Sequence, residues 1–185
     1  DGTRAVSGSE DRTIRVWDLE DGRVDRVLRA HWGAVQGLAL SQDGHTIASI
    51  SEDRTVRVWE LPEGRTRQLF TGHSHQMRAI AWLPDNARIV FSPGDETVIV
   101  LDVAEKRVVA TCRGHDSLVR AVAISADGGY ILTGSSDRTL RLFDAANGEM
   151  LRTFEGHQGQ INCVAITLDG RIAVTGAQDG TLRTW

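Results

Sequence analysis

Apolar and polar residues alternate with a period of two along short runs of this chain. Such runs are residues 150–154 (MLRTF), 161–166 (INCVAI), 171–175 (RIAVT) and 181–185 (TLRTW). Side chains of a β-strand point alternately to its two faces, so this period predicts strands, and no window has the 3.6-residue period of an amphipathic helix. Asn147-Gly148 and Asp169-Gly170 are dipeptides that tolerate the positive φ of tight turns. The sequence therefore predicts small four-stranded antiparallel meanders.

Three residue types recur at one spacing of 42 residues. They are a histidine at 31, 73, 115 and 157, an aspartate at 11, 53, 95, 137 and 179, and a large apolar residue at Trp17, Trp59, Leu101, Phe143 and Trp185. The chain of 185 residues holds 185/42, about 4.4, such repeats. We read it as one domain with a partial blade over 1–29, full repeats over 30–71, 72–113 and 114–155, and a partial repeat over 156–185. One meander cannot bury both of its faces, so neighbouring units are expected to stack.

Short motifs mark the ends and the middle of each unit. They are Gly72-His73, Gly114-His115, Gly156-His157 and Trp17-Asp18, with Asp137-Arg138-Thr139 and its equivalents between them. By these motifs the chain resembles the WD40-repeat family over its whole length. The resemblance implies an all-β fold of the β-propeller type, in which one repeat supplies the last strand of one blade and the first three strands of the next.

The resemblance also sets an expectation about how much of a propeller is present. By that division, the chain starts at the second strand of one blade and stops at the third strand of the fifth. Propellers of this family usually close with about seven blades, so we expect a partial propeller. An open arc exposes two apolar blade faces, which soluble monomers rarely tolerate. We therefore expect these faces to be covered by the remaining blades of the same, longer chain or by another copy.

Each histidine is followed 22 residues later by an aspartate, and a hydroxyl residue precedes most of these aspartates by four positions. The hydroxyl residues are Ser7, Ser49, Thr133 and Thr175. Hydroxyl, imidazole and carboxylate groups together also form the triads of hydrolases. A catalytic triad occurs once in a chain, whereas this set recurs from repeat to repeat. We therefore expect it to be structural.

In the WD40 family the same residue types form a buried tetrad that links aspartate, histidine, hydroxyl and tryptophan. Two tetrads are complete by sequence, namely His31, Ser49, Asp53 and Trp59, and His157, Thr175, Asp179 and Trp185. A further set has His115, Thr133 and Asp137, with Phe143 in place of tryptophan. The third repeat departs most, because Phe91 replaces the hydroxyl and Leu101 the tryptophan. We expect its local stability to be the lowest.

Composition excludes several classes of function. The chain is 41% hydrophobic and 25% charged, and its formal net charge is −4. This is globular composition without a basic field, so we expect neither a nucleic-acid nor a membrane partner. Cys112 and Cys163 lack metal-type spacing, and one histidine per blade keeps the histidines apart, so we expect no metal and no cofactor. Two cysteines are too few for a disulfide scaffold, which favours a cytoplasmic protein.

By resemblance, partners bind at the top rim, which is made of loops at one end of the blades. The candidate partner-binding residues there are Glu10, Trp32, Gln36, Glu52, Gln76, Arg78, Arg120, Ser136, Asn162 and Gln178. Glu10 and Glu52 make one side acidic, and two arginines make the next side basic, which suits a partner that carries both charges. Any of these residues is alternatively an ordinary solvated loop residue. Trp32, whose counterparts are polar, is either a binding anchor or packs on its neighbouring blade.

We therefore expect a non-catalytic scaffold whose partner is a protein or peptide at the top rim. The near-constant repeat length resembles the tandem WD40 arrays of bacterial signalling proteins, which implies a sensor or regulatory part of a larger protein. Two alternatives stay open. One is a hydrolase-like enzyme built on a propeller scaffold, and the other is a purely architectural array whose rim binds nothing.

Overall fold

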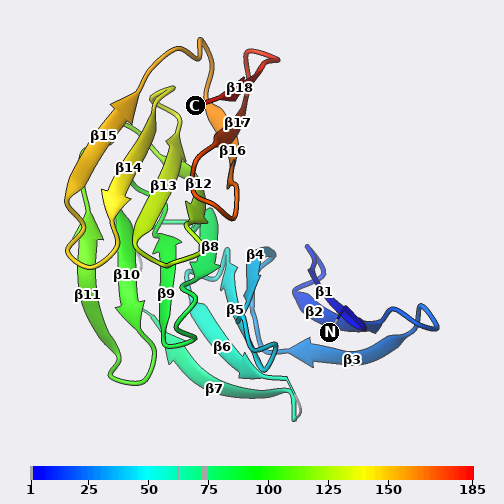
Figure 1. Ribbon diagram of the computed structural model, residues 1–185. Helices are drawn as coiled ribbons and strands as arrows, with labels where there is room; N and C mark the ends of the chain where they lie inside the picture. The colour runs from blue at the N-terminus through cyan, green and yellow to red at the C-terminus, as the bar shows by residue number, and fades with distance from the viewer. Residues whose placement is uncertain (1, 62, 72–74) are drawn as a thin grey trace.

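The computed structural model describes residues 2–61, 63–71 and 75–185, which form eighteen β-strands (Figure 1). The first sheet contains β1 (Arg4–Gly8), β2 (Thr13–Asp18) and β3 (Val24–Arg29). The second contains β4 (Val35–Leu40), β5 (Thr46–Ser51), β6 (Val56–Glu60) and β7 (Arg65–Phe70), and the third contains β8 (Ala79–Trp82), β9 (Arg88–Ser92), β10 (Val98–Asp102) and β11 (Arg107–Cys112). The fourth contains β12 (Val119–Ile124), β13 (Tyr130–Ser135), β14 (Leu140–Asp144) and β15 (Met150–Phe154), and the fifth contains β16 (Ile161–Ile166), β17 (Ala173–Ala177) and β18 (Leu182–Thr184). Within these described ranges, no helix is long and apolar enough to cross a membrane.

The five sheets are antiparallel meanders, in which strands adjacent in sequence are hydrogen-bonded neighbours. They follow one another around an open arc, with β1–β3 at one end and β16–β18 at the other (Figure 1). The three central sheets have four strands each and the two end sheets have three. The structure thus confirms the all-β fold of tandem four-stranded blades, as in a segment of a propeller.

Aspartate side chains shape the turns between the first and second strands of a blade. In the β4–β5 turn, Asp43 Oδ1 accepts hydrogen bonds from the Ser41 hydroxyl (2.6 Å) and the His45 N–H (2.9 Å), and Gly44 has a φ of 73°. Asp169 Oδ1 likewise accepts from the N–H of Arg171 (3.1 Å) in the β16–β17 turn. Residues 171 and 172 therefore belong to the turn and β17 begins at Ala173, so the strand predicted over 171–175 begins two residues too early.

Apolar side chains fill the space between neighbouring sheets. The cluster between the second and third sheets contains Ala48, Ile50, Val56, Val58, Met77, Trp82, Ile89, Phe91, Leu101 and Val103. Equivalent clusters join the first sheet to the second, the third to the fourth and the fourth to the fifth. A fully buried Val, Leu, Ile, Phe or Met side chain contributes roughly 1.5–3 kcal/mol to the stability of the fold. Stacking of the blades is therefore what stabilises the arc.

The outer faces of the two end sheets stay exposed. Leu182 on β18 is 77% exposed, whereas its counterparts Ile14, Val56, Val98 and Leu140 are at most 1% exposed. At the other end, Leu19 is 54% exposed, while its counterparts Leu61, Val103 and Ala145 are at most 8% exposed. A further blade on either face would bury these side chains. That the same chain or another copy supplies such blades stays a prediction.

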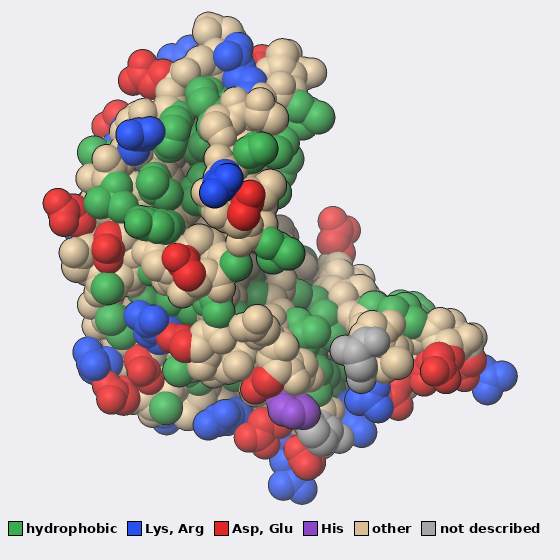
Figure 2. Space-filling model, viewed as in Figure 1, with side chains coloured by type: hydrophobic (Ala, Val, Ile, Leu, Met, Phe, Trp, Pro, Cys, Tyr) green, Lys and Arg blue, Asp and Glu red, His purple; other side chains and the backbone are tan. Residues whose placement is uncertain are grey.

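Charged side chains of both signs are interspersed over the face of the molecule drawn in Figure 2. Small groups of hydrophobic side chains reach the surface between them. No field of one sign covers this face.

Candidate functional site

A chain of buried hydrogen bonds joins four side chains of the second blade. His31 lies in the loop before β4, Ser49 on β5, Asp53 in the β5–β6 turn and Trp59 on β6. His31 Nδ1 lies 2.9 Å from Asp53 Oδ2, and His31 Nε2 lies 2.7 Å from the Ser49 hydroxyl oxygen. The same oxygen accepts a hydrogen bond from the indole N–H of Trp59 at 2.8 Å. The loop, the turn and two strands are thereby tied together.

The surroundings of His31 and Asp53 decide their protonation. Burial lowers the pKa of His31 below its ordinary value, although Asp53 acts in the opposite direction. Burial alone would raise the pKa of Asp53, but hydrogen bonds from Thr55, the Trp32 N–H and His31 outweigh it and lower that pKa. The ring is therefore neutral at pH 7, donates from Nδ1 to the carboxylate and accepts the Ser49 proton at Nε2.

This burial argues against a hydrolytic role for the set. The side chains of His31 and Asp53 are 1% and 7% exposed, and Ser49 is 0% exposed. A nucleophile has to approach the reacting carbon of a substrate, and these atoms are covered by the strands around them. The arrangement satisfies buried polar groups that would each cost about 1–3 kcal/mol if left unpaired.

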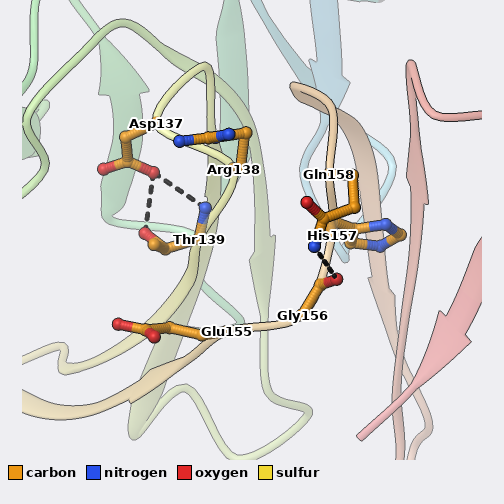
Figure 3. A pocket seen from close by; sticks show the side chains of 7 residues that line it. All are labelled: Asp137, Arg138, Thr139, Glu155, Gly156, His157 and Gln158. Atoms are coloured by element: carbon orange, nitrogen blue, oxygen red, sulfur yellow. Dashed lines mark hydrogen bonds between the residues drawn. The ribbon is translucent and has the colours of Figure 1, made fainter.

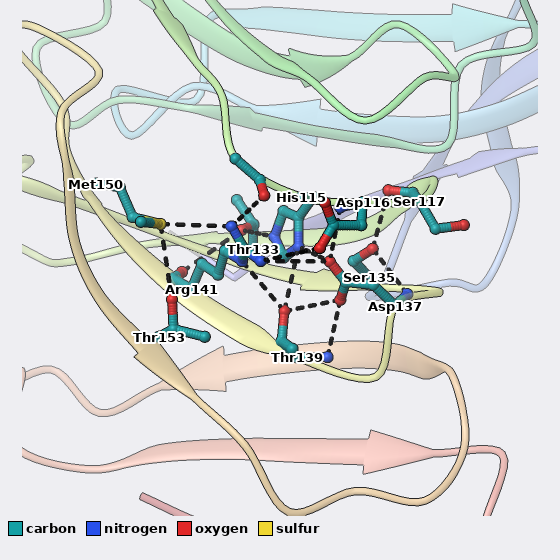
Figure 4. A network of polar contacts seen from close by, with 11 residues as sticks. His115, Asp116, Ser117, Thr133, Ser135, Asp137, Thr139, Arg141, Met150 and Thr153 are labelled. Atoms are coloured by element: carbon teal, nitrogen blue, oxygen red, sulfur yellow. Dashed lines mark hydrogen bonds and ion pairs between the residues drawn. The ribbon is translucent and has the colours of Figure 1, made fainter.

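The fourth and fifth blades contain the same arrangement with one difference. In the fourth blade His115 lies 2.7 Å from Asp137 Oδ2 and 2.6 Å from Thr133 Oγ1, but Phe143 has no indole N–H to offer (Figure 4). In the fifth blade the corresponding set is complete. His157 Nδ1 lies 2.9 Å from Asp179 Oδ2, and His157 Nε2 lies 2.7 Å from Thr175 Oγ1. The same Thr175 oxygen accepts a hydrogen bond from the Trp185 indole N–H at 2.9 Å. The structure thus brings together the residues of all three sets.

The third blade has apolar side chains at the positions of the hydroxyl and the indole. Phe91 is 0% exposed and Leu101 is 6% exposed, and Met77 is buried beside them in the same cluster. The Asp95 carboxylate accepts two hydrogen bonds from Thr97, from its N–H at 2.8 Å and its hydroxyl at 2.7 Å. His73 lies outside the residues that the structure describes.

Three of the expected partner-binding residues lie at bulges that sequence reasoning did not foresee. The pairing of the first and second strands shifts register between Val35 and Gly37, between Val119 and Ala121, and between Ile161 and Cys163. The extra residue at each shift is Gln36, Arg120 or Asn162. A bulge turns the side chain of its extra residue away from the regular alternation of the strand, here at the rim. The repeat spacing identified these three positions as equivalent, but the alternation did not indicate a bulge.

Of the ten expected rim residues, eight are exposed and two are half-buried. Exposed side chains are those of Glu10, Trp32, Gln36, Glu52, Gln76, Arg78, Asn162 and Gln178, while Arg120 and Ser136 are half-buried. Gln36 Nε2 donates to Glu52 Oε1 at 2.9 Å, and Arg120 Nε donates to the Ser136 hydroxyl at 2.7 Å. Arg78 Nη2 donates a long hydrogen bond of 3.5 Å to Gln76 Oε1. The structure therefore pairs residues of the first-strand bulge with residues of the turn between the second and third strands.

Two shallow depressions lie on this rim. One, of about 480 Å³, is lined by Glu10, Arg12, Trp32, Gly33, Ala34 and Glu52. The other, of about 340 Å³, is lined by Asp137, Arg138, Thr139, Glu155, Gly156, His157 and Gln158 (Figure 3). Arg12 and Arg138 were not among the expected rim residues. Both have left-handed backbone conformations, with φ of 70° and 72°. Gly180 stands at the same position of the fifth repeat, and a glycine there could have revealed a turn that requires a positive φ.

Over the described part of the chain, no group of three or more histidine, cysteine or carboxylate side chains is arranged to hold a metal ion. Cys112 is buried, and burial raises the pKa of its thiol to about 12, so it is neither a ready ligand nor a nucleophile at neutral pH. Cys163 is exposed on the outer face of the last sheet. The chemistry of the rim is therefore that of hydrogen bonds, charges and one indole.

Comparison with known proteins gives the same repeats. The family model for the WD domain, G-beta repeat, matches residues 1–18, 22–60, 64–102, 106–144 and 148–185. The nuclear distribution protein nudF of Aspergillus terreus is 48% identical over 46 residues, which is 24% of this chain and 10% of the relative. Transducin beta-like protein 3 of Rattus norvegicus is 47% identical over 51 residues, 26% of this chain and 6% of the relative.

A third relative, the human angio-associated migratory cell protein, is 48% identical over 50 residues, 25% of this chain and 12% of its own length. The aligned part of the chain thus spans 12% or less of each of these three eukaryotic relatives. The similarity lies in the repeat itself, and proteins built from this repeat are typically non-catalytic scaffolds for protein–protein interaction. With five tandem matches that together cover nearly all of its length, the chain belongs to the WD40-repeat family.

Proposed function

We propose that this chain is the non-catalytic interaction part of a larger protein and binds a protein or peptide at its rim. The observation that carries the proposal is a rigid backbone beneath exposed, variable side chains. The half-buried aspartates Asp53, Asp137 and Asp179 accept hydrogen bonds from the loop N–H groups of residues 32, 116 and 158, at 2.9, 3.1 and 2.7 Å. A loop that is already ordered loses little conformational entropy when it binds.

The charges of the rim support a partner with both signs of charge. Glu10 and Glu52 lie around one depression, and Arg78 and Arg120 belong to the two following blades. Opposite charges on neighbouring blades orient a partner of complementary charge and speed its encounter. The side chains differ between repeats while the buried networks beneath them recur, which is what a specialised surface on a common scaffold requires.

The absence of catalysis is part of the same proposal. The Ser/Thr, His and Asp side chains that resemble a triad are buried and satisfy one another, as the second, fourth and fifth blades show by their distances. We further propose a cytoplasmic setting and a role in signalling, with this array acting as a sensor or regulatory part. A bacterial origin stays a prediction, because the relatives described above are eukaryotic.

The experiment that tests this function reverses the basic side of the rim in the intact protein. Arg78→Glu with Arg120→Glu changes the charge by about four units where a partner would bind. Proteins captured from the source cells by the unaltered protein are identified by mass spectrometry, and we expect the variant to lose at least one of them about tenfold or more.

A matched control makes the same charge change at the opposite end of the blades. Lys106→Glu with Arg171→Glu alters two exposed residues of the β10–β11 and β16–β17 turns. We expect this variant to retain every captured protein. Equal loss from both variants, or no loss from the rim variant, contradicts the proposed rim interface.

A further inference from the structure

Trp32 differs from every other tryptophan of the chain. The indole N–H groups of Trp17, Trp59, Trp82 and Trp185 donate hydrogen bonds to Ser7, Ser49, the Ala39 carbonyl and Thr175, at 2.8–3.1 Å. Trp32 is 81% exposed, and its indole N–H has no hydrogen-bond partner among the residues that the structure describes. The alternative that Trp32 packs on its neighbouring blade is therefore wrong. A large aromatic side chain whose polar group is unused and whose faces are open is suited to an intermolecular contact.

Two carboxylates lie beside this indole without a cationic partner. Glu10 and Glu52 line the same depression of about 480 Å³ as Trp32. Neither has an ion pair within the described part of the chain, and no described cation stacks on the Trp32 ring. Gln36 donates to Glu52 Oε1 and so orients this carboxylate, while its other oxygen is left without a partner in the described chain. Arg12, which also lines the depression, reduces its charge to a net −1.

The backbone holds Trp32 in place. Its N–H donates to Asp53 Oδ2 at 2.9 Å, so the residue is tied to the buried network of the second blade. The next residue is Gly33, where a Cβ atom would lie 2.7 Å from the Asp53 nitrogen, closer than such atoms approach. The loop therefore lies directly on the β5–β6 turn, and the backbone that carries the indole is held in place. Binding to it loses little backbone conformational entropy.

The equivalent depression of the last two blades shows that the repeat does not require this chemistry. Gln158 stands at the position of Trp32 there, and its side-chain nitrogen donates to the Gly156 carbonyl at 3.3 Å. The charged residues that line this depression are Asp137, Arg138 and Glu155, and the Asp137 carboxylate accepts hydrogen bonds from the Thr139 N–H and hydroxyl (Figure 3). Of the two rim depressions, only the one between the first two blades combines an open indole with two carboxylates that have no ion pair in the described structure.

We propose that the depression around Trp32 binds an arginine side chain of the partner. This inference rests on the proposed function and names the chemical group that the rim recognises. A guanidinium is planar, stacks on an indole face and can offer parallel N–H donors to a carboxylate. The Trp32 N–H is left to donate to a carbonyl oxygen of the same peptide. A volume of about 480 Å³ falls within the usual size of ligand clefts, about 300–1,000 Å³.

The test uses the intact protein labelled with 5-fluorotryptophan. The fluorine signal of Trp32 is assigned by its absence in Trp32→Phe. The acetylated, amidated peptide Gly-Arg-Gly is titrated in, and the same peptide with citrulline in place of arginine is the neutral control of the same shape. We expect arginine to shift the Trp32 signal saturably, with at least about tenfold weaker binding of the citrulline peptide. The signals of the four hydrogen-bonded tryptophans are expected not to move.

A matched pair of variants checks the carboxylate. We expect Glu52→Gln to weaken binding of the arginine peptide about fivefold or more, and Glu155→Gln, at the depression without an indole, to leave it unchanged. Equal shifts with arginine and citrulline, or no saturable shift, would overturn the inference. If the peptide fails while reversal of the basic rim still removes a captured protein, the arginine site is wrong and the rim interface stands. If the peptide binds while that reversal removes nothing, the arginine site stands and the basic side of the rim is not the interface.

Discussion

The second and third blades build the same frame around opposite kinds of interior. In both blades the second and third strands pair in one register, since Ser49 faces Arg57 and Phe91 faces Ile99 at the corresponding positions. The second blade places His31, Ser49 and Trp59 in that space as a hydrogen-bonded network. The third blade fills it with Phe91 and Leu101. The register therefore does not depend on the polar network.

The two interiors fail in different ways when they are altered. An apolar interior that loses volume is left with a cavity, because the surrounding strands relax only in part. When a polar interior loses one hydrogen-bonding atom, the donors and acceptors around it are left unpaired. The free-energy cost of these buried, unpaired groups exceeds the net contribution of the hydrogen bond itself. Substitutions at equivalent positions can thus measure what each kind of interior contributes.

The largest effect is expected in the third blade. Phe91→Ala removes a fully buried ring and should lower the free energy of unfolding by about 3–5 kcal/mol. Urea unfolding gives the total, and hydrogen exchange of β8–β11 localises it. Phe91→Leu keeps most of the volume and should cost less than about 1.5 kcal/mol. A loss below about 1 kcal/mol for the alanine variant would show that the interior collapses onto the space and is not tightly packed.

In the second blade, Ser49→Ala is expected to cost about 2–4 kcal/mol, because it leaves His31 Nε2 and the Trp59 N–H unpaired in a buried site. Urea unfolding measures the loss. Ser49→Thr is the control, since Thr133 and Thr175 occupy the same position in other blades, and it should be nearly neutral. If alanine is tolerated as well as threonine, the network does not stabilise the blade.

A smaller effect is expected in the fourth blade. Thr133→Val keeps the shape of the side chain and removes the contact with His115 and a long hydrogen bond of 3.5 Å to the Arg141 carbonyl, but no indole contact, because Phe143 offers no N–H. We expect a loss of about 1–2 kcal/mol. The same substitution at Thr175 also leaves the Trp185 N–H without its acceptor and should cost about 1 kcal/mol more. Losses of equal size, compared by hydrogen exchange of the two blades, would mean that the indole adds nothing.

The smallest effect comes from pH. The folded protein lowers the pKa of His31 below its ordinary 6.5, chiefly by burial. The unfolded chain therefore takes up this proton at a higher pH than the folded chain, and stability is lost as the pH falls below about 6.5. Asp53 titrates far lower and does not contribute in this range. Between pH 7.5 and 5.5 we expect a few-fold rise in the exchange of β4–β7, corrected for intrinsic rates, and His31→Gln should flatten it. An unchanged slope in that variant would assign the effect to another group.

Some features of the rim were predictable from repeat spacing and some were not. The spacing identified Gln36, Arg120 and Asn162 as equivalent, but not the bulge that turns them, because a bulge depends on two strands and not on the alternation within one. It identified Trp32 as unlike its counterparts and left open whether the indole packs or projects. Arg12 and Arg138 were missed because left-handed arginine has no sequence signal apart from a glycine in another repeat.

Local chemistry repeated at a constant interval was enough to predict the strands and the stacking of repeated units, and the resemblance to the WD40 family added the buried tetrads. Alternation follows from the two faces of a strand, and matching donors and acceptors 18 to 22 residues apart recur only if each repeat folds alike. The exposure of Trp32, its unused N–H and its two neighbouring carboxylates without an ion pair came from the packing of two blades and a turn against one loop. The depression combines Glu10 of the first blade with Trp32 and Glu52 of the second, so it exists only once the blades have stacked.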